Sequence, residues 1–148
     1  MKKSLLTLGA TMALTFGAFT PTNNTVEAAT SCYSSYEFDA TFSSRESTDY
    51  WALCKGTLKV SGTISGSGPT YKPVGNKAKV SVEVYREKWG PDELVDEFEV
   101  TVYDDESGDF DYTIGKTDLA NYYLKFTPTS TEGNGTWTFE ATGTISTN

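Results

Sequence analysis

An alternation of apolar and polar residues restricts the fold more than any other feature of this chain. In the segments 80–84 and 98–102 every second residue is apolar and the residues between them are polar. This period of two is typical of β-strands with one buried face, as in antiparallel sheets. The pattern recurs in seven segments, at residues 36–42, 58–64, 79–85, 97–102, 110–114, 122–126 and 137–145. We therefore expect seven strands.

Residues that favour turns lie between these segments. They occur at 66–69, 90–92, 107–108, 128–130 and 133–135. Glycine supplies the positive φ and proline the fixed φ that many turns require, so we expect each group to end a strand. Residues 29–148 have the length of one domain. The pattern predicts an all-β fold, a single antiparallel β-sandwich of about seven strands, with a partly closed barrel as the alternative.

Residues 1–28 have the three parts of a secretory signal peptide. Lys2 and Lys3 form the positive start, 5–19 form an apolar run of 15 residues, and Val26 and Ala28 precede a predicted cleavage ahead of Ala29. The apolar run is shorter than the roughly 20 residues of a membrane-spanning helix. We expect a cleaved, secreted protein in the extracellular space, with no transmembrane segment in the mature chain.

The mature chain is strongly acidic. The full sequence has 12 basic and 20 acidic residues, and leaving out Lys2, Lys3 and Glu27 gives 10 and 19 for residues 29–148, a net charge of −9. Proteins bind nucleic acids and anionic lipids largely through lysine and arginine, so this charge argues against both partners. Neutral glycans, cationic ligands and metal ions remain as candidate partners.

The two cysteines of the chain, Cys32 and Cys54, are both in the exported part. Disulfides are common in exported domains, and a bond here would close a loop of 23 residues, which stabilises a fold by roughly 3 kcal/mol. We expect this disulfide, with a pair of buried free thiols as the alternative. In neither state do the cysteines form a catalytic site, because the chain has no histidine to activate a thiolate.

A short motif near the sixth predicted strand bears on the type of sandwich. Residues 118–124 read Asp-Leu-Ala-Asn-Tyr-Tyr-Leu, the pattern D-x-A-x-Y-x-L. This resembles immunoglobulin-like domains, in which such a tyrosine, here Tyr122, bonds through its hydroxyl to the backbone of the preceding corner. The chain also resembles the short secreted β-sandwich proteins of Gram-positive bacteria. That resemblance implies an extracellular accessory role and no particular chemistry.

An acidic run at 104–111 is the densest group of charges. Calcium prefers carboxylate and carbonyl oxygens, so Asp104, Asp105, Asp109 and Asp111 are candidate Ca²⁺ ligands. The alternative is a solvated connection between two strands of a hairpin, with Ser107 and the following glycine at the turn. Apart from this Ca²⁺, we expect no cofactor.

Four aromatic residues are candidates for stacking on sugar rings. Tyr85 and Tyr103 fall on the polar side of their predicted strands, and Trp51 and Trp89 fall at strand edges or in loops. Trp89 precedes Gly90 and Pro91, so its loop should stand clear of the sheet. The alternative is that these rings cover sheet edges and fill the ends of the sandwich.

The sequence gives little support for catalysis. It has no histidine, no Gly-x-Ser-x-Gly motif and no phosphate-binding loop. We therefore expect a secreted, non-enzymatic protein that acts through its surface, as a binding module or as a component associated with the cell envelope or matrix. Its partner would be a cell-wall or extracellular glycan, or a protein. The alternatives are a glycan-binding module that uses exposed aromatic rings, a small enzyme inhibitor, or a hydrolase without a recognisable motif.

Overall fold

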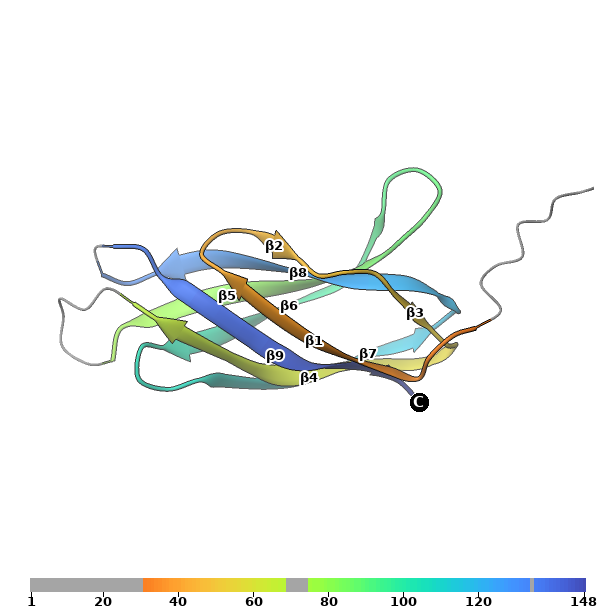
Figure 1. Ribbon diagram of the computed structural model, residues 1–148, viewed down its shortest axis with the longest axis horizontal. Coiled ribbons are helices and arrows are strands. Elements are labelled where there is room, and N and C mark those ends of the chain that lie inside the picture. The colour runs from red at the N-terminus through yellow and green to blue at the C-terminus, as the bar shows by residue number, and fades with distance from the viewer. Residues whose placement is uncertain (1–30, 69–74, 134) are drawn as a thin grey trace, which may run out of the picture.

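The computed structural model describes residues 31–68, 75–133 and 135–148. All regular structure in these residues is β-strand, and the strands form two sheets that pack face to face (Figure 1). The predicted all-β sandwich is confirmed. The predicted signal peptide, residues 1–28, lies outside the described residues.

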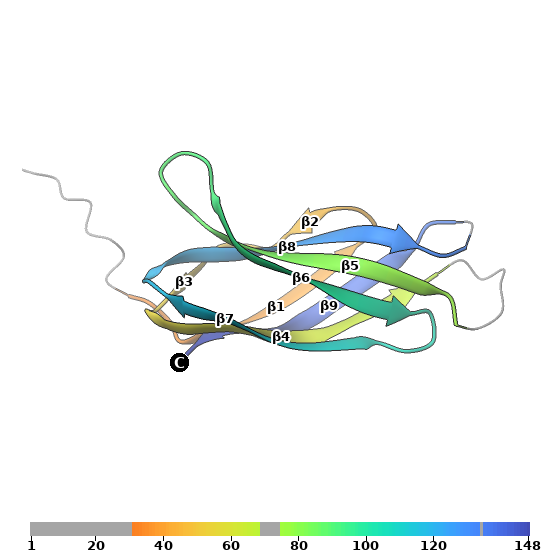
Figure 2. The same cartoon turned by 180° about the vertical axis from the view of Figure 1, so that it is seen from behind.

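Both sheets are antiparallel. The four-stranded sheet contains, in spatial order, β1 (Ser35–Phe42), β9 (Thr138–Thr147), β4 (Gly56–Ser67) and β7 (Gly108–Thr117). The five-stranded sheet contains β2 (Glu46–Ser47) and β3 (Trp51–Leu53), which both pair with β8 (Ala120–Thr131), followed by β5 (Lys77–Arg86) and β6 (Glu93–Tyr103). The seven longer strands are those that the alternation predicted, and β2 and β3 are additional. The edges formed by β6 and β7 lie on the same side of the sandwich (Figure 2).

The core lies between the two sheets and contains a stack of aromatic rings. Phe126 of the five-stranded sheet stacks on Phe42 with a centroid distance of 5.4 Å, and Phe42 stacks on Phe139 at 5.3 Å. Trp137 continues the stack at 5.8 Å from Phe139. Apolar residues at alternate positions of the long strands surround these rings, among them Leu58, Val60, Ile64, Val80, Val82, Val84, Leu124 and Ile145, all fully buried.

Two glycines allow large rings to enter this core. Gly62 of β4 and Gly143 of β9 are paired across the four-stranded sheet. A Cβ atom at Gly62 would meet the Phe110 ring at 3.0 Å, and one at Gly143 would meet the Phe38 ring at 2.7 Å. A Cβ at Gly143 would also overlap a backbone carbonyl oxygen of β4. Packing therefore requires glycine at both positions, because any Cβ atom would collide with a neighbouring ring or with the backbone.

The tyrosine predicted to close the corner before the sixth long strand does so. Tyr122 at the start of β8 is fully buried, and its hydroxyl donates a 2.8 Å hydrogen bond to the backbone carbonyl of Asp118. Strand pairing differs from that of a constant-type immunoglobulin domain at two of the long strands. The last strand, β9, pairs with β1 and β4, whereas in immunoglobulin domains the last strand pairs with the sixth. The fourth long strand, β6, pairs with the third, β5, whereas in constant-type domains the fourth strand pairs with the fifth.

The expected disulfide between Cys32 and Cys54 is confirmed, with a Cα–Cα distance of 4.9 Å. It links the residues before β1 of one sheet to the residue after β3 of the other. Beside it, the Tyr33 amide donates to the Ala52 carbonyl at 2.9 Å, and the Cys54 amide donates to the Tyr33 carbonyl at 3.0 Å. The bond therefore ties the two sheets together at this end.

Two of the expected turns are different in the structure. Pro128, Thr129 and Ser130 do not end a strand but lie inside β8, where the register with β5 shifts between Lys79 and Val80. Proline is tolerated there because a bulge leaves a backbone position without a ladder hydrogen bond. The connection at 104–107 is not a hairpin, because β6 and β7 belong to different sheets. It leads the chain from one layer of the sandwich to the other.

Candidate functional site

Among the residues that the structure describes, the most exposed aromatic side chain is on the connection between β5 and β6. This hairpin tip, residues 87–92, stands out from the sandwich (Figures 1 and 2). Trp89 lies in the tip and is fully exposed, as its position beside a glycine and a proline predicted. Gly90 has a φ of +99°, which glycine adopts without strain and which turns the chain at this point. The tip therefore holds an indole ring in solvent.

Both ends of the hairpin tip are bonded to β8. The Asn121 side chain donates to the Glu87 carboxylate at 2.6 Å, and the Glu87 amide donates to the Asn121 carbonyl at 2.9 Å. On the other side of the tip, the Tyr123 hydroxyl donates to the Asp92 carboxylate at 3.0 Å. These contacts fix the base of the tip, so Trp89 is displayed from a supported loop.

A row of three tyrosines crosses the outer face of the five-stranded sheet beside the tip. Tyr50 contacts Tyr123 with a centroid distance of 4.8 Å, and Tyr123 stacks on Tyr85 at 5.2 Å with an interplanar angle of 12°. The Lys125 ammonium covers the Tyr85 ring at 4.3 Å. Burial, and after it the hydrogen bond to Asp92, raises the pKa of Tyr123 to about 12. Tyr123 therefore supports the row, and Tyr50, which is 54% exposed, is its accessible ring.

A half-buried carboxylate extends this tyrosine row along β5. Glu83 Oε1 lies 3.4 Å from the Tyr85 hydroxyl, and Arg45 Nη2 lies 3.9 Å from Glu83 Oε2. Glu83 Oε2 is buried and accepts no hydrogen bond from the described residues. Burial, and then the charge of Glu83, raises the pKa of Tyr85. The surface beside Trp89 thus combines aromatic rings with hydrogen-bonding groups of both signs of charge.

The other two predicted aromatic residues do not join this surface. Trp51 is buried, with its ring 6.2 Å from that of Tyr36 and 6.3 Å from that of Phe38, so it belongs to the core. Its place at the start of β3 directs it inward. Tyr103 is 40% exposed but ends β6, at the opposite end of the β5–β6 hairpin from Trp89. The structure therefore corrects the expected set: Trp89 and Tyr85 remain, and Tyr50 and Tyr123 join them.

The four aspartates considered for Ca²⁺ have separate surroundings. Asp104 accepts hydrogen bonds from the Gly75 amide at 2.8 Å and the Asn76 side chain at 3.1 Å, and the first of these contributes most to lowering the pKa of Asp104. Asp109 accepts from the Thr63 hydroxyl at 3.0 Å.

Asp111 forms an ion pair with Lys59 at 2.8 Å, and Asp105 is exposed. The described residues contain no group of three or more side chains placed to hold a metal ion. The reason is topological: the run crosses from one sheet to the other, so its two halves point to different surroundings.

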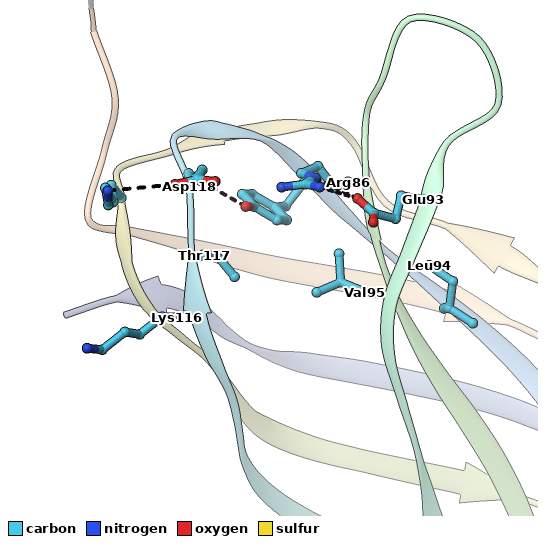
Figure 3. A pocket seen from close by; sticks show the side chains of 9 residues that line it. Arg86, Glu93, Leu94, Val95, Lys116, Thr117 and Asp118 are labelled. Carbon is cyan, nitrogen blue, oxygen red and sulfur yellow. Dashed lines mark hydrogen bonds and ion pairs between the residues drawn. The ribbon is translucent and has the colours of Figure 1, made fainter.

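A second feature, a pocket of about 420 Å³, opens where β6 and β7 diverge. Val95 and Thr117 point into it from the two strands (Figure 3), and Tyr122 of β8 is also part of its lining. Arg86 and Glu93 form an ion pair at its rim, with Arg86 Nε 2.8 Å from Glu93 Oε2. Hydrogen bonds from Lys88 and then from Arg86 lower the pKa of Glu93. The pocket therefore combines a few apolar side chains with charged residues from both strands.

Tyr123 was not among the predicted site residues, but the alternation in the sequence contained a signal for it. Because Tyr122 faces the core, the alternation places its neighbour Tyr123 on the outer face, where it meets Tyr85. No such signal exists for Tyr50, which lies in the irregular segment between β2 and β3.

No helix in the described part of the chain is long and apolar enough to cross a membrane. No protein-family model and no curated protein matches the sequence.

Proposed function

We propose that this chain is a secreted, non-enzymatic binding protein that attaches to a cell-wall or extracellular glycan. In this proposal the Trp89 ring stacks on the apolar face of a sugar, and Tyr50 provides a second ring. Asp92, which is bonded to Tyr123 in the tyrosine row, and Arg45, which lies near Glu83 of the same surface, would bond sugar hydroxyls. The observation that carries the proposal is full exposure of Trp89 on a hairpin tip whose two ends are bonded to β8.

Such an arrangement is unfavourable unless something covers the ring. Tryptophan has the largest apolar side chain, and leaving it in water forgoes the stabilisation that burial would give. Indole rings are also frequent among the few residues that contribute most to binding. Because the base of the tip is already ordered, little conformational entropy is lost when a ligand binds. The absence of histidine in the sequence agrees with a role in contact rather than in acid–base catalysis.

The test is retention of the mature protein on insoluble cell-wall material and on neutral polysaccharides such as cellulose and chitin. Substitution of a dominant contact residue costs about 2 kcal/mol or more, so Trp89→Ala should weaken binding by at least about 30-fold. Its melting temperature should stay within about 2 °C of the parent, because Trp89 contacts no core residue.

Tyr103→Ala is the matched control, since it removes an exposed ring from the other end of the hairpin. It should bind as the parent does. If the parent is retained on no glycan, the proposal is wrong. If the Trp89→Ala variant is retained as strongly as the parent, Trp89 does not contribute to glycan binding.

A further inference from the structure

The two edge strands β6 and β7 leave an opening in the side of the sandwich. In the described residues β6 pairs only with β5, and β7 pairs only with β4. At one end the edges are closed, because Phe98 of β6 contacts Phe110 at 5.6 Å and Tyr112 at 4.5 Å. At the other end the strands separate (Figure 2). No described strand pairs with the outer edge of residues 93–97, where Val95 is the extra residue of a register shift against β5 and the Glu97 amide donates to the Asp96 carboxylate at 2.8 Å.

The space between the separating strands is the pocket already described. Val95 and Thr117 point into it, and charged residues of both strands, among them Glu93 and Lys116, complete its lining (Figure 3). Its volume of about 420 Å³ exceeds that of any one apolar side chain. A strand placed against β6 would send every second side chain towards this space. The edge thus offers main-chain groups and a pocket for side chains at the same place, the combination that binds added strands in other proteins.

The outer side of the same edge is acidic. Glu97 and Glu99 point outward from β6 and alternate with the inward residues Phe98 and Val100. Glu99 is paired with Lys79 at 2.6 Å. Glu97 accepts a hydrogen bond from the Ser81 hydroxyl at 2.6 Å and, like Asp96, has no ion pair within the described residues. In a sheet, a basic side chain directly opposite an acidic one on the neighbouring strand stabilises the pairing of the two strands. A strand added here would therefore have basic residues on its outer side.

We propose that the free edge of β6 binds an extended peptide in which apolar residues alternate with lysine or arginine. Its backbone adds a sixth strand to the five-stranded sheet, its apolar side chains enter the pocket between β6 and β7, and its basic side chains lie beside Glu97 on the outer face. This site is distinct from the glycan surface around Trp89, so each can fail without the other.

The test uses three synthetic peptides of about eight residues, long enough to form one strand. Two alternate Lys with Val and Glu with Val, and the third is the Lys-Val peptide with every backbone nitrogen methylated. The Lys-Val peptide should bind, and its affinity should fall as salt is raised. The methylated peptide has the same charge but cannot donate main-chain hydrogen bonds, so it should not bind. The Glu-Val peptide should not bind, because its charges repel Glu97. Amide shifts in the NMR spectrum should concentrate at residues 93–99 and 116–118.

A matched pair of variants then tests the position. Glu97→Lys should weaken the Lys-Val peptide by about tenfold, because it opposes like charges at the site. Glu37→Lys makes the same change of charge on β1, the edge strand on the other side of the sandwich, and should have little effect.

Three results would overturn the proposal. One is equal binding of the methylated peptide, which would show attraction of charge alone. Another is a set of amide shifts on β1 or on the hairpin tip. The third is concentration-dependent dimerisation through β6, which would assign the edge to a second copy of the chain.

Discussion

Removal of the disulfide should reduce stability by an amount that the structure allows us to estimate. Cys32 and Cys54 are 22 positions apart, and a cross-link closing a loop of this size restricts the unfolded chain by roughly 3 kcal/mol. Few other contacts hold the segment before β1, where Tyr33 forms an isolated bridge to Leu53. We therefore expect the double variant Cys32→Ser/Cys54→Ser to lose roughly 3 kcal/mol of unfolding free energy and about 10 °C in melting temperature.

Urea unfolding followed by tryptophan fluorescence measures this loss. The dependence of the free energy on urea should change little, because the core remains the same. Parent protein that has been reduced and alkylated is the control and should match the double variant. Hydrogen exchange should show lost protection at the amides of Tyr33 and Cys54, with β5 and β8 less affected. A loss below about 1 kcal/mol, or an equal loss of protection in every strand, would refute the reasoning.

The remaining predictions concern the corner, the core and alkaline pH. Tyr122→Phe should lower the free energy of unfolding by about 1 kcal/mol, because it removes one hydrogen bond and keeps the ring. Gly143→Ala should lower it by about 3 kcal/mol or more, since the new Cβ would overlap the backbone of β4 and press on the Phe38 ring. Urea unfolding checks both, and unchanged midpoints would contradict them. The pKa of Tyr123, about 12, lies above the ordinary value near 10, so the folded state holds this proton more tightly. The resulting stabilisation is complete below about pH 10 and is lost as pH rises towards 12. Asp92→Asn should lower the pKa of Tyr123, and an unchanged ultraviolet absorbance titration would contradict that.

The sequence predicted the elements that depend on local pattern. Alternation identified every long strand, and the corner motif identified the hydrogen bond of Tyr122, because both features arise within a few residues of the chain. The short strands β2 and β3 could not be predicted in this way. They have two and three residues, and they form only because the edge of β8 offers hydrogen bonds to them.

Site residues were harder to predict than strands. Trp51 and Trp89 look alike in the sequence, since each lies beside a predicted strand end. Trp51 is buried because β3 pairs with β8 and turns the ring towards Tyr36, whereas Trp89 has no neighbouring layer to enter. The aspartates at 104 and 109 are close in sequence but were separated by the crossing between sheets. In each case the pairing of distant strands decided the surroundings.

The two proposed surfaces are connected through the base of one hairpin. Glu93 at the start of β6 binds Lys88 of the hairpin tip at 2.8 Å and also binds Arg86 at the rim of the pocket. Because both cations donate hydrogen bonds to it, the pKa of Glu93 lies below the ordinary value, and the carboxylate stays charged where an unpaired one begins to take up a proton. Glu93 therefore lies between the two proposed surfaces, while the tip keeps its own contacts with β8 through Glu87 and Asp92.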